Sequence, residues 1–162
     1  DNMKPNDHKY PFWTLYNMIK IDENCIFKYD SEEFNAVDQI CLYVYEMMDE
    51  LQYSIKRQAA LLIALMYSVV PIEVIRDLDI LEKTLQILLL FCEEEEDTEM
   101  IDIIFNALEN IYYLLQNSRD FISSESKVID LFNQCRESLK NVYFNINIQN
   151  YEILHDMVID FI

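Results

Sequence analysis

The fold is decided by residues 53–117, whose sequence is YSIKRQAALLIALMYSVVPIEVIRDLDILEKTLQILLLFCEEEEDTEMIDIIFNALENIYYLLQN. Apolar residues recur there at intervals of three and four, which is the period of a helix with one buried face. We predict, in order, a helix (Ser54 to Ser68), a stop at Pro71, a short helix (Ile72 to Leu78), a second helix (Leu81 to Cys92), an acidic loop (Glu93 to Asp97) and a long helix (Thr98 to Asn117). Since seven of the eleven residues from Leu81 to Phe91 are apolar, we expect that helix to be central.

The composition of the chain predicts an all-α domain. The 162 residues are 52% hydrophobic and 13% aromatic, which excludes disorder. Glycine is absent and proline occurs three times, so the glycine turns that β-hairpins prefer are missing. The longest apolar runs, Ala59 to Met66 and Ile87 to Cys92, are much shorter than the roughly 20 residues of a membrane span. We therefore expect no membrane segment and, because the chain begins with polar residues, no secretory leader.

The charge and the cysteines limit the partners and the compartment. Thirty acidic and twelve basic residues give a formal net charge of −18. Nucleic acid is not expected as a partner, because phosphate binding requires clustered Lys and Arg. A basic partner fits, because an acidic surface attracts cationic segments, although solubility alone also explains the charge. The four cysteines form no Cys-x-x-Cys pair, which is typical of reduced core residues in an intracellular protein: Cys25, Cys41, Cys92 and Cys135.

Trp13 and Asn17 are the most informative pair in the sequence. They lie four residues apart, so the indole and the carboxamide stand one turn above the other on a helix. That helix has its apolar stripe on another face, formed by Phe12, Leu15, Tyr16 and Ile19. Two interpretations stay open at this point. The pair either lies exposed and binds a ligand, or Trp13 packs in the core while Asn17 caps the helix or faces water.

The next helices are predicted to lie in stacked layers. Ser31 is the expected N-cap of a helix that runs to about Glu50, with acidic residues in its first turn. The apolar positions of this helix cover two of its sides. In the helix that follows, Ala59, Ala60 and Ala64 allow a neighbouring helix to approach closely.

The helix from Thr98 to Asn117 carries a polar stripe beside its core face. Asp102, Asn106 and Asn110 fall at steps of four. Such carboxylate and carboxamide groups can bond the main chain and the lysine heads of an extended peptide, although an ordinary solvent-facing stripe would look the same. The acidic run from Glu93 to Asp97 is also open to two interpretations, a solvated loop or a docking patch for a basic partner.

A short helix followed by two longer ones is the unit of an armadillo-type repeat, which buries its faces only against neighbouring units. The segment Pro11-Phe12-Trp13-Thr14-Leu15-Tyr16-Asn17-Met18 resembles the third helix of such a repeat in the importin alpha family, the adaptors that carry nuclear localisation signals. Three later segments resemble the same helix: Gln58 to Leu65, Ile104 to Ile111 and Tyr151 to Phe161. The equivalent positions are Trp13, Leu61, Asn106 and Leu154, spaced by 48, 45 and 48 residues, near the roughly 40 to 47 of these repeats.

The resemblance covers essentially the whole chain, as the C-terminal part of a longer solenoid. It implies a right-handed α-solenoid of about three and a half repeats. Its units are the third helix of one repeat (10–21), a repeat (22–69), a second repeat (71–117) and a terminal repeat (119–162). It also implies short first helices at 73–79 and 127–135. Leu61 and Leu65 depart from the family, in which tryptophan and asparagine are usual at these positions.

The function implied by the resemblance is nuclear import. In that family a concave, acidic groove lined by asparagines binds basic nuclear localisation signals, and here its peptide-binding residues would be Trp13, Asn17, Asp102, Asn106 and Asn110. The implied localisation is the cytoplasm and the nucleus. The implied partners besides cargo are importin beta, through a segment that would precede Asp1, and an export receptor at the last repeats. No cofactor and no metal ion are implied.

An enzyme is not expected. The two histidines, His8 and His155, are far apart, and Glu152 with His155 forms one Glu-x-x-His where a di-iron bundle would need two. Without glycine there is no phosphate-binding loop and no dinucleotide fingerprint.

The alternative function is a compact all-α interaction module that captures an amphipathic partner helix and has no import role. It would use Leu61, Leu65 and the methionines as an apolar groove, with Trp13 in the core. The exposure of these side chains therefore discriminates between the two functions.

Overall fold

The computed structural model describes residues 9–25, 35–69, 77–92, 97–118, 120, 122 and 126–159. Within these ranges the chain is all-α, as the composition predicts, with seven α-helices, one 3₁₀ turn and no strand. The elements are α1 (Lys9–Ile21), α2 (Ala36–Met47), the 3₁₀ turn η2 (Met48–Glu50), α3 (Tyr53–Val69), α4 (Leu78–Leu89), α5 (Thr98–Asn117), α6 (Val128–Tyr143) and α7 (Ile148–Asp156).

Asparagine and aspartate caps fix where four of these helices begin. In each case the side-chain oxygen of the cap accepts a backbone N–H two or three residues further on, which satisfies a donor that the first turn leaves free. The caps are Asn35 for α2, Asp77 for α4, Asp97 for α5 and Asn147 for α7. The predicted start of α2 after Ser31 is therefore wrong, since the helix begins at Ala36. Ser31 itself lies outside the described residues.

Other predicted boundaries were right for two helices and wrong for three. The bounds of α5 agree with the sequence pattern, and α3 differs by one residue at each end. The cap at Asp77 starts α4 within the stretch predicted as a separate short helix, whose first residues, 72–76, lie outside the described ranges. The predicted first helix at 127–135 is instead the first half of the 16-residue α6. The last helix, predicted to reach Phe161, ends at Asp156.

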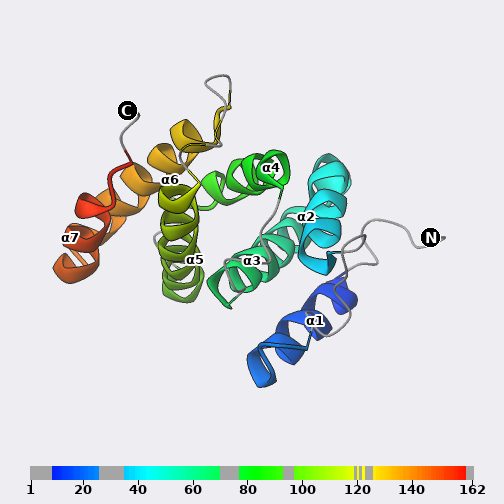
Figure 1. Ribbon diagram of the computed structural model, residues 1–162. Helices are drawn as coiled ribbons and strands as arrows, with labels where there is room; N and C mark the ends of the chain where they lie inside the picture. The colour runs from blue at the N-terminus through cyan, green and yellow to red at the C-terminus, as the bar shows by residue number, and fades with distance from the viewer. Residues whose placement is uncertain are drawn as a thin grey trace.

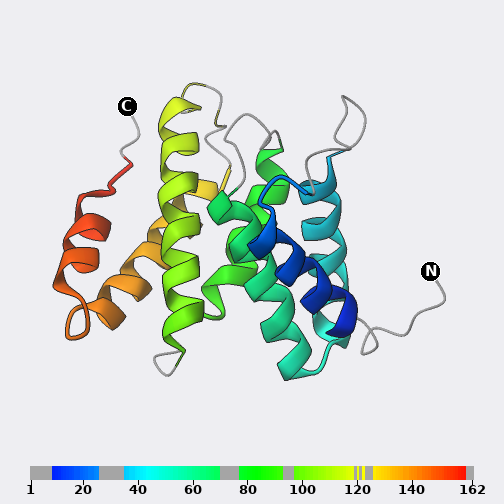
Figure 2. The same cartoon turned by 90° about the horizontal axis from the view of Figure 1, so that it is seen from below.

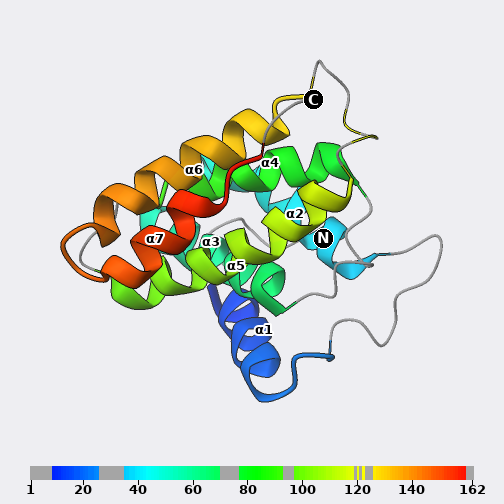
Figure 3. The ribbon, with the colours of Figure 1, turned by 60° about the vertical axis from the view of Figure 1, so that its left-hand side comes forward.

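The helices pack in two rows that alternate along the chain (Figure 1). In one row α1 packs on α3 and α3 on α5, and in the other α2 packs on α4 and α4 on α6. Helix α7 packs on α6. Figures 1 and 2 show α1 and α2 at one end of the molecule and α6 and α7 at the other. In Figure 1, α4 lies between α2 and α6, and α5 lies between α3 and α7. Figure 3 shows α4 and α6 on one side of the molecule and α1 on the opposite side. Within the two rows, each helix therefore packs on helices about 45 residues away in the sequence, whereas α7 packs on α6, its neighbour in the chain.

The most deeply buried helix is α3. All its residues from Ala59 to Tyr67 are buried, because α1 and α5 flank the helix and α2 and α4 also pack on it. The three alanines predicted to admit close neighbours, Ala59, Ala60 and Ala64, have no exposed surface. Helix α4, which was predicted to be central, packs on α2, α3 and α6 and buries Leu81, Leu85 and Leu88, whereas Leu90, which follows its last turn, is 65% exposed.

A small polar cluster lies in the core where α2, α3 and α4 meet. Burial raises the pKa of the Cys41 thiol to about 12, while the side chains of Thr84 and Tyr67 beside it act in the opposite direction. Burial also raises the pKa of Tyr67. None of the four cysteines, all within the described ranges, forms a disulfide, and only Cys25 is partly exposed. This agrees with their prediction as thiols that form no disulfide.

Candidate functional site

Trp13 and Asn17 lie on the outside of α1. The indole of Trp13 is 51% exposed and Asn17 is exposed as well. The predicted apolar stripe of the same helix is turned to α3, with Phe12, Tyr16 and Ile19 buried. The structure therefore excludes the interpretation of Trp13 as a core residue and leaves the pair accessible to a ligand.

A three-residue cluster links α1 to α5. The Tyr16 hydroxyl donates a hydrogen bond to Glu99 Oε1 at 2.5 Å, and Lys20 Nζ lies 3.5 Å from the same oxygen. The Lys20 ammonium also lies 5.3 Å from the centroid of the Tyr16 ring. The hydrogen bond from Tyr16 holds the pKa of the Glu99 carboxyl below its ordinary value, and burial raises the pKa of Tyr16. An ammonium group thus sits between an aromatic face and a carboxylate on this surface.

Sequence reasoning missed this cluster. Glu99 lies 83 residues from Tyr16, and nothing local to either residue indicates the contact. The only signal was the spacing of Tyr16 and Lys20, which four residues apart share one face of α1.

Leu61 and Leu65 do not line an open groove. They are only 5% and 7% exposed. The physical reason is that α1 and α5 both pack on α3 and touch each other through Tyr16 and Glu99. Leu61 and Leu65 stand where the family usually has a peptide-binding tryptophan and asparagine, and because they are buried they cannot contact a peptide. Their burial also removes the apolar groove on which the alternative function depends.

The polar stripe on α5 divides into three different environments. Asn110 Nδ2 donates to the backbone carbonyls of Tyr67 and Ser68, at 2.9 and 2.8 Å, near the C-terminal end of α3. Asp102 is exposed but accepts a 2.6 Å hydrogen bond from the Tyr143 hydroxyl of α6. Burial, with this hydrogen bond, raises the pKa of Tyr143. Asn110 and Asp102 therefore hold helices together, which their spacing did not predict.

Asn106 remains as the accessible member of the stripe. It is exposed, and we find no hydrogen bond from its side chain to the residues that the structure describes. Glu99 lies on the same helix, and its side chain is 57% exposed. Together with Trp13 and Asn17 on α1, these two residues form the candidate site, which we call the α1–α5 surface.

The acidic run before α5 is described only at its last residue. Residues 93–96 lie outside the described ranges, so neither interpretation of the run is tested. Asp97 caps α5 by accepting the N–H of Met100 at 3.0 Å. It also forms an ion pair with Arg57 of α3.

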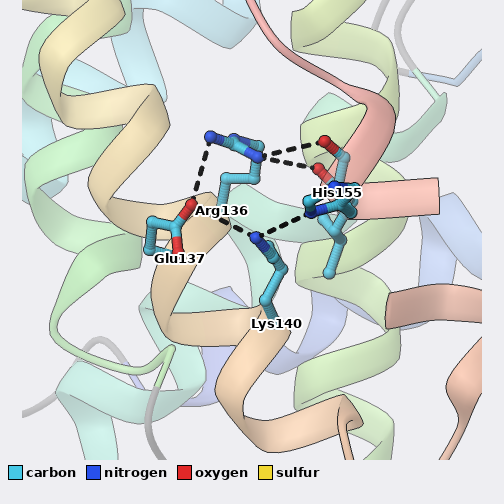
Figure 4. A network of polar contacts seen from close by, with 5 residues as sticks. Arg136, Glu137, Lys140 and His155 are labelled. Atoms are coloured by element: carbon cyan, nitrogen blue, oxygen red, sulfur yellow. Dashed lines mark hydrogen bonds and ion pairs between the residues drawn. The ribbon is translucent and has the colours of Figure 1, made fainter. Parts of the chain in front are cut away.

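A second polar network joins α6 to α7 (Figure 4). Arg136 donates through Nη1 to the carbonyls of Leu154 and His155, at 3.1 and 3.4 Å, and so caps the C-terminal end of α7. Lys140 Nζ lies 3.2 Å from His155 Nδ1, and Glu137 pairs with both cations. Figure 4 shows both cationic side chains directed from α6 toward α7. Arg136 and Lys140 are both buried, and a buried cation needs hydrogen-bond or charge partners. Because residues of α7 supply several of these partners, the network holds α7 against α6.

Among the described residues we find no group of three His, Cys, Asp or Glu side chains placed to hold a metal ion. No helix in the same ranges is long and apolar enough to span a bilayer. The sequence matches no known protein family model, and comparisons with curated proteins and with solved structures gave no significant match.

Proposed function

We propose that this protein is an armadillo-type repeat protein that binds a basic, extended peptide on the α1–α5 surface, as a nuclear-import adaptor does. The alternating two-row packing supports the proposal, because helices of one row start 44 or 45 residues apart at Lys9, Tyr53 and Thr98. Such spacing is that of stacked armadillo or HEAT units. A solenoid of this kind presents one row of helices to a ligand.

The observation that carries the proposal is the exposure of Trp13 beside Asn17. An exposed indole face holds the aliphatic stem and the cationic head of a lysine or arginine side chain. A carboxamide one turn away both donates and accepts, so it can pair with the main chain of an extended peptide. Trp13 is the only tryptophan in the chain, and half of its surface is open.

The neighbouring cluster supports a basic ligand. Lys20 already places its ammonium over the Tyr16 ring and against Glu99, which is the chemistry that a lysine of a bound peptide would use. Glu99 keeps its charge at neutral pH, since the hydrogen bond from Tyr16 lowers its pKa. The net charge of −18 adds long-range attraction for a cationic segment.

The expected path of the peptide follows from the exposed residues. It would contact Trp13 and Asn17 on α1, cross the Tyr16–Glu99 contact and reach Asn106 on α5. The buried Leu61 and Leu65 offer it no slot on α3, and Asp102 and Asn110 are already bonded within the protein. A peptide held at so few points is expected to bind weakly, with a Kd on the order of 10 to 100 µM.

The cellular role that fits this binding is carriage of nuclear localisation signals, with residence in both the cytoplasm and the nucleus. Importin beta and an export receptor are the partners that such an adaptor would need. Binding of an amphipathic helix in a groove at Leu61 and Leu65 is not proposed, because both side chains are buried.

The test is a binding titration with a fluorescein-labelled peptide of the Lys-Lys-x-Lys type, followed by anisotropy at low salt. We expect Trp13→Ala with Asn17→Ala to weaken binding at least tenfold and to leave far-UV circular dichroism unchanged, because both residues are exposed. Met18→Ala is the matched control. Met18 is 47% exposed on the same helix but about 140° around it from Trp13, so its loss should not matter.

Two results would contradict the proposal. One is a double variant that binds the peptide as the unchanged protein does. The other is a peptide with serine in place of lysine that binds equally well.

A further inference from the structure

The row of helices formed by α2, α4 and α6 carries an exposed leucine between two hollows. Leu90, at the C-terminal end of α4, is 65% exposed and lines both hollows. One, of about 660 Å³, lies toward α6 and is lined by Leu89, Leu90, Asp130, Asn133, Gln134, Glu137 and Ser138. The other, of about 430 Å³, lies toward α2 and is lined by Tyr45, Glu46, Met48, Asp49, Gln86, Ile87 and Leu90. We call these residues together the Leu90 surface.

The charges of the Leu90 surface have one sign. Its lining includes four carboxylates and no lysine or arginine. Glu137 is paired with Arg136 and Lys140, so it is already neutralised. In the described part of the chain we find no ion pair to the other three, Glu46, Asp49 and Asp130. Lys83 is a cation beside this surface, and its Nζ lies 5.5 Å from the centroid of the Tyr45 ring.

We infer that the Leu90 surface binds a basic amphipathic helix of a partner protein. The apolar side chains of that helix would enter the two hollows beside Leu90, and its lysine or arginine heads would face Glu46, Asp49 and Asp130. Charge complementarity selects a cationic partner over a second copy of this chain, whose own charge is −18.

The spacing of the hollows favours a helix. Packed helices lie about 8 to 10 Å apart, so hollows on the two sides of α4 are separated by about that distance. Residues seven apart on a helix lie on one face and are about 10.5 Å apart along its axis. A helix also satisfies its own backbone hydrogen bonds, which suits a surface that lacks a sheet edge.

This inference does not depend on the proposed function. Leu90 belongs to the row of α2, α4 and α6, whereas Trp13 and Asn17 belong to α1 in the other row. The two surfaces can therefore be removed one at a time.

The experiment uses the full chain and a labelled helical peptide of about 18 residues, rich in lysine and alanine, with leucines seven residues apart on one face. We expect Leu90→Ser to weaken binding at least tenfold, as loss of a central apolar anchor does. Met18→Ser, an equally apolar and half-exposed position on α1, should bind as the unchanged protein does. The Trp13→Ala and Asn17→Ala double variant should also keep its affinity.

A second set of variants tests the charges without touching Leu90. Glu46→Gln, Asp49→Asn and Asp130→Asn together should weaken binding at least tenfold. The control set removes three exposed charges elsewhere and so changes the net charge equally: Glu23→Gln, Glu152→Gln and Asp156→Asn. It should reduce affinity by no more than about twofold.

Three outcomes would overturn the inference. The first is equal binding of a peptide in which the leucines are replaced by serine, since charge alone would then explain the complex. The second is a folded Leu90→Ser variant with unchanged affinity. The third is an equal effect of the two charge sets.

Discussion

Asn110 and Asn106 provide a sharp test of the structure, because they lie one turn apart on α5 and have the same side chain. Asn110 Nδ2 donates two hydrogen bonds to the last carbonyls of α3, whereas Asn106 extends into solvent. We predict that Asn110→Ala destabilises the protein and that Asn106→Ala does not.

The magnitude follows from the two lost bonds. Each hydrogen bond contributes about 0.5 to 1.5 kcal/mol net, and a partly buried carbonyl left without a donor costs more. Replacing asparagine by alanine inside a helix gains roughly 0.5 kcal/mol, but this gain is the same at both positions. The free energy of unfolding should therefore differ by about 2 kcal/mol between the two variants. For a chain of this length that corresponds to about 4 to 8 °C in Tm.

The assay is urea and thermal unfolding followed by far-UV circular dichroism, with hydrogen exchange of the C-terminal turn of α3 as a local readout. Asn110→Asp and Asn106→Asp form a second matched pair, since a carboxylate keeps the shape but cannot donate to a carbonyl. If Asn110→Ala and Asn106→Ala unfold within about 0.5 kcal/mol of each other, Asn110 does not bridge α5 to α3 and the packing described above is wrong.

Three further predictions test other contacts. Because the pKa of Glu99 is lowered in the folded protein, its contact with Tyr16 should stabilise above about pH 4.5 and be lost as the pH falls below that value, so Glu99→Gln should flatten the acid limb of a stability profile. Arg136→Met should destabilise by about 2 to 4 kcal/mol, because it removes two charge-assisted bonds to α7, and hydrogen exchange should rise in α7 before it rises in α3. At pH 8 a thiol reagent should modify the partly exposed Cys25 while leaving Cys41, whose pKa is about 12, unreacted until the protein unfolds, and equal rates for the two would contradict the burial of Cys41.

The individual helices were largely predictable because their signals are local. The 3.6-residue period of apolar positions located α3 and α5 within one residue of each end. The start of α4 was missed because Asp77 was placed inside a separate short helix, predicted from Ile72 to Leu78. The capping preference of Asp77 is nevertheless a local signal. The division of α6 into two helices followed the family resemblance and not the residue pattern, which is continuous from Val128 to Tyr143.

The candidate site was predictable only in part. The spacing of Trp13 and Asn17 placed them on one face of a helix that buries another face, and the structure leaves both exposed. The same reasoning grouped Asp102 and Asn110 with Asn106, although two of the three bond to neighbouring helices. Spacing determines which residues share a face but not what that face meets.

The sequence alone determined that the chain is helical, where most helices lie and which side of each is apolar, because these properties depend on neighbours within one or two turns. The tertiary structure alone decided that Tyr16 meets Glu99, that Leu61 is buried and that Leu90 is exposed. These outcomes depend on helices that are far apart in the sequence, as for Tyr16 and Glu99, which are separated by 83 residues. Because the chain has more apolar residues than one core can cover, packing selects which of them reach the surface.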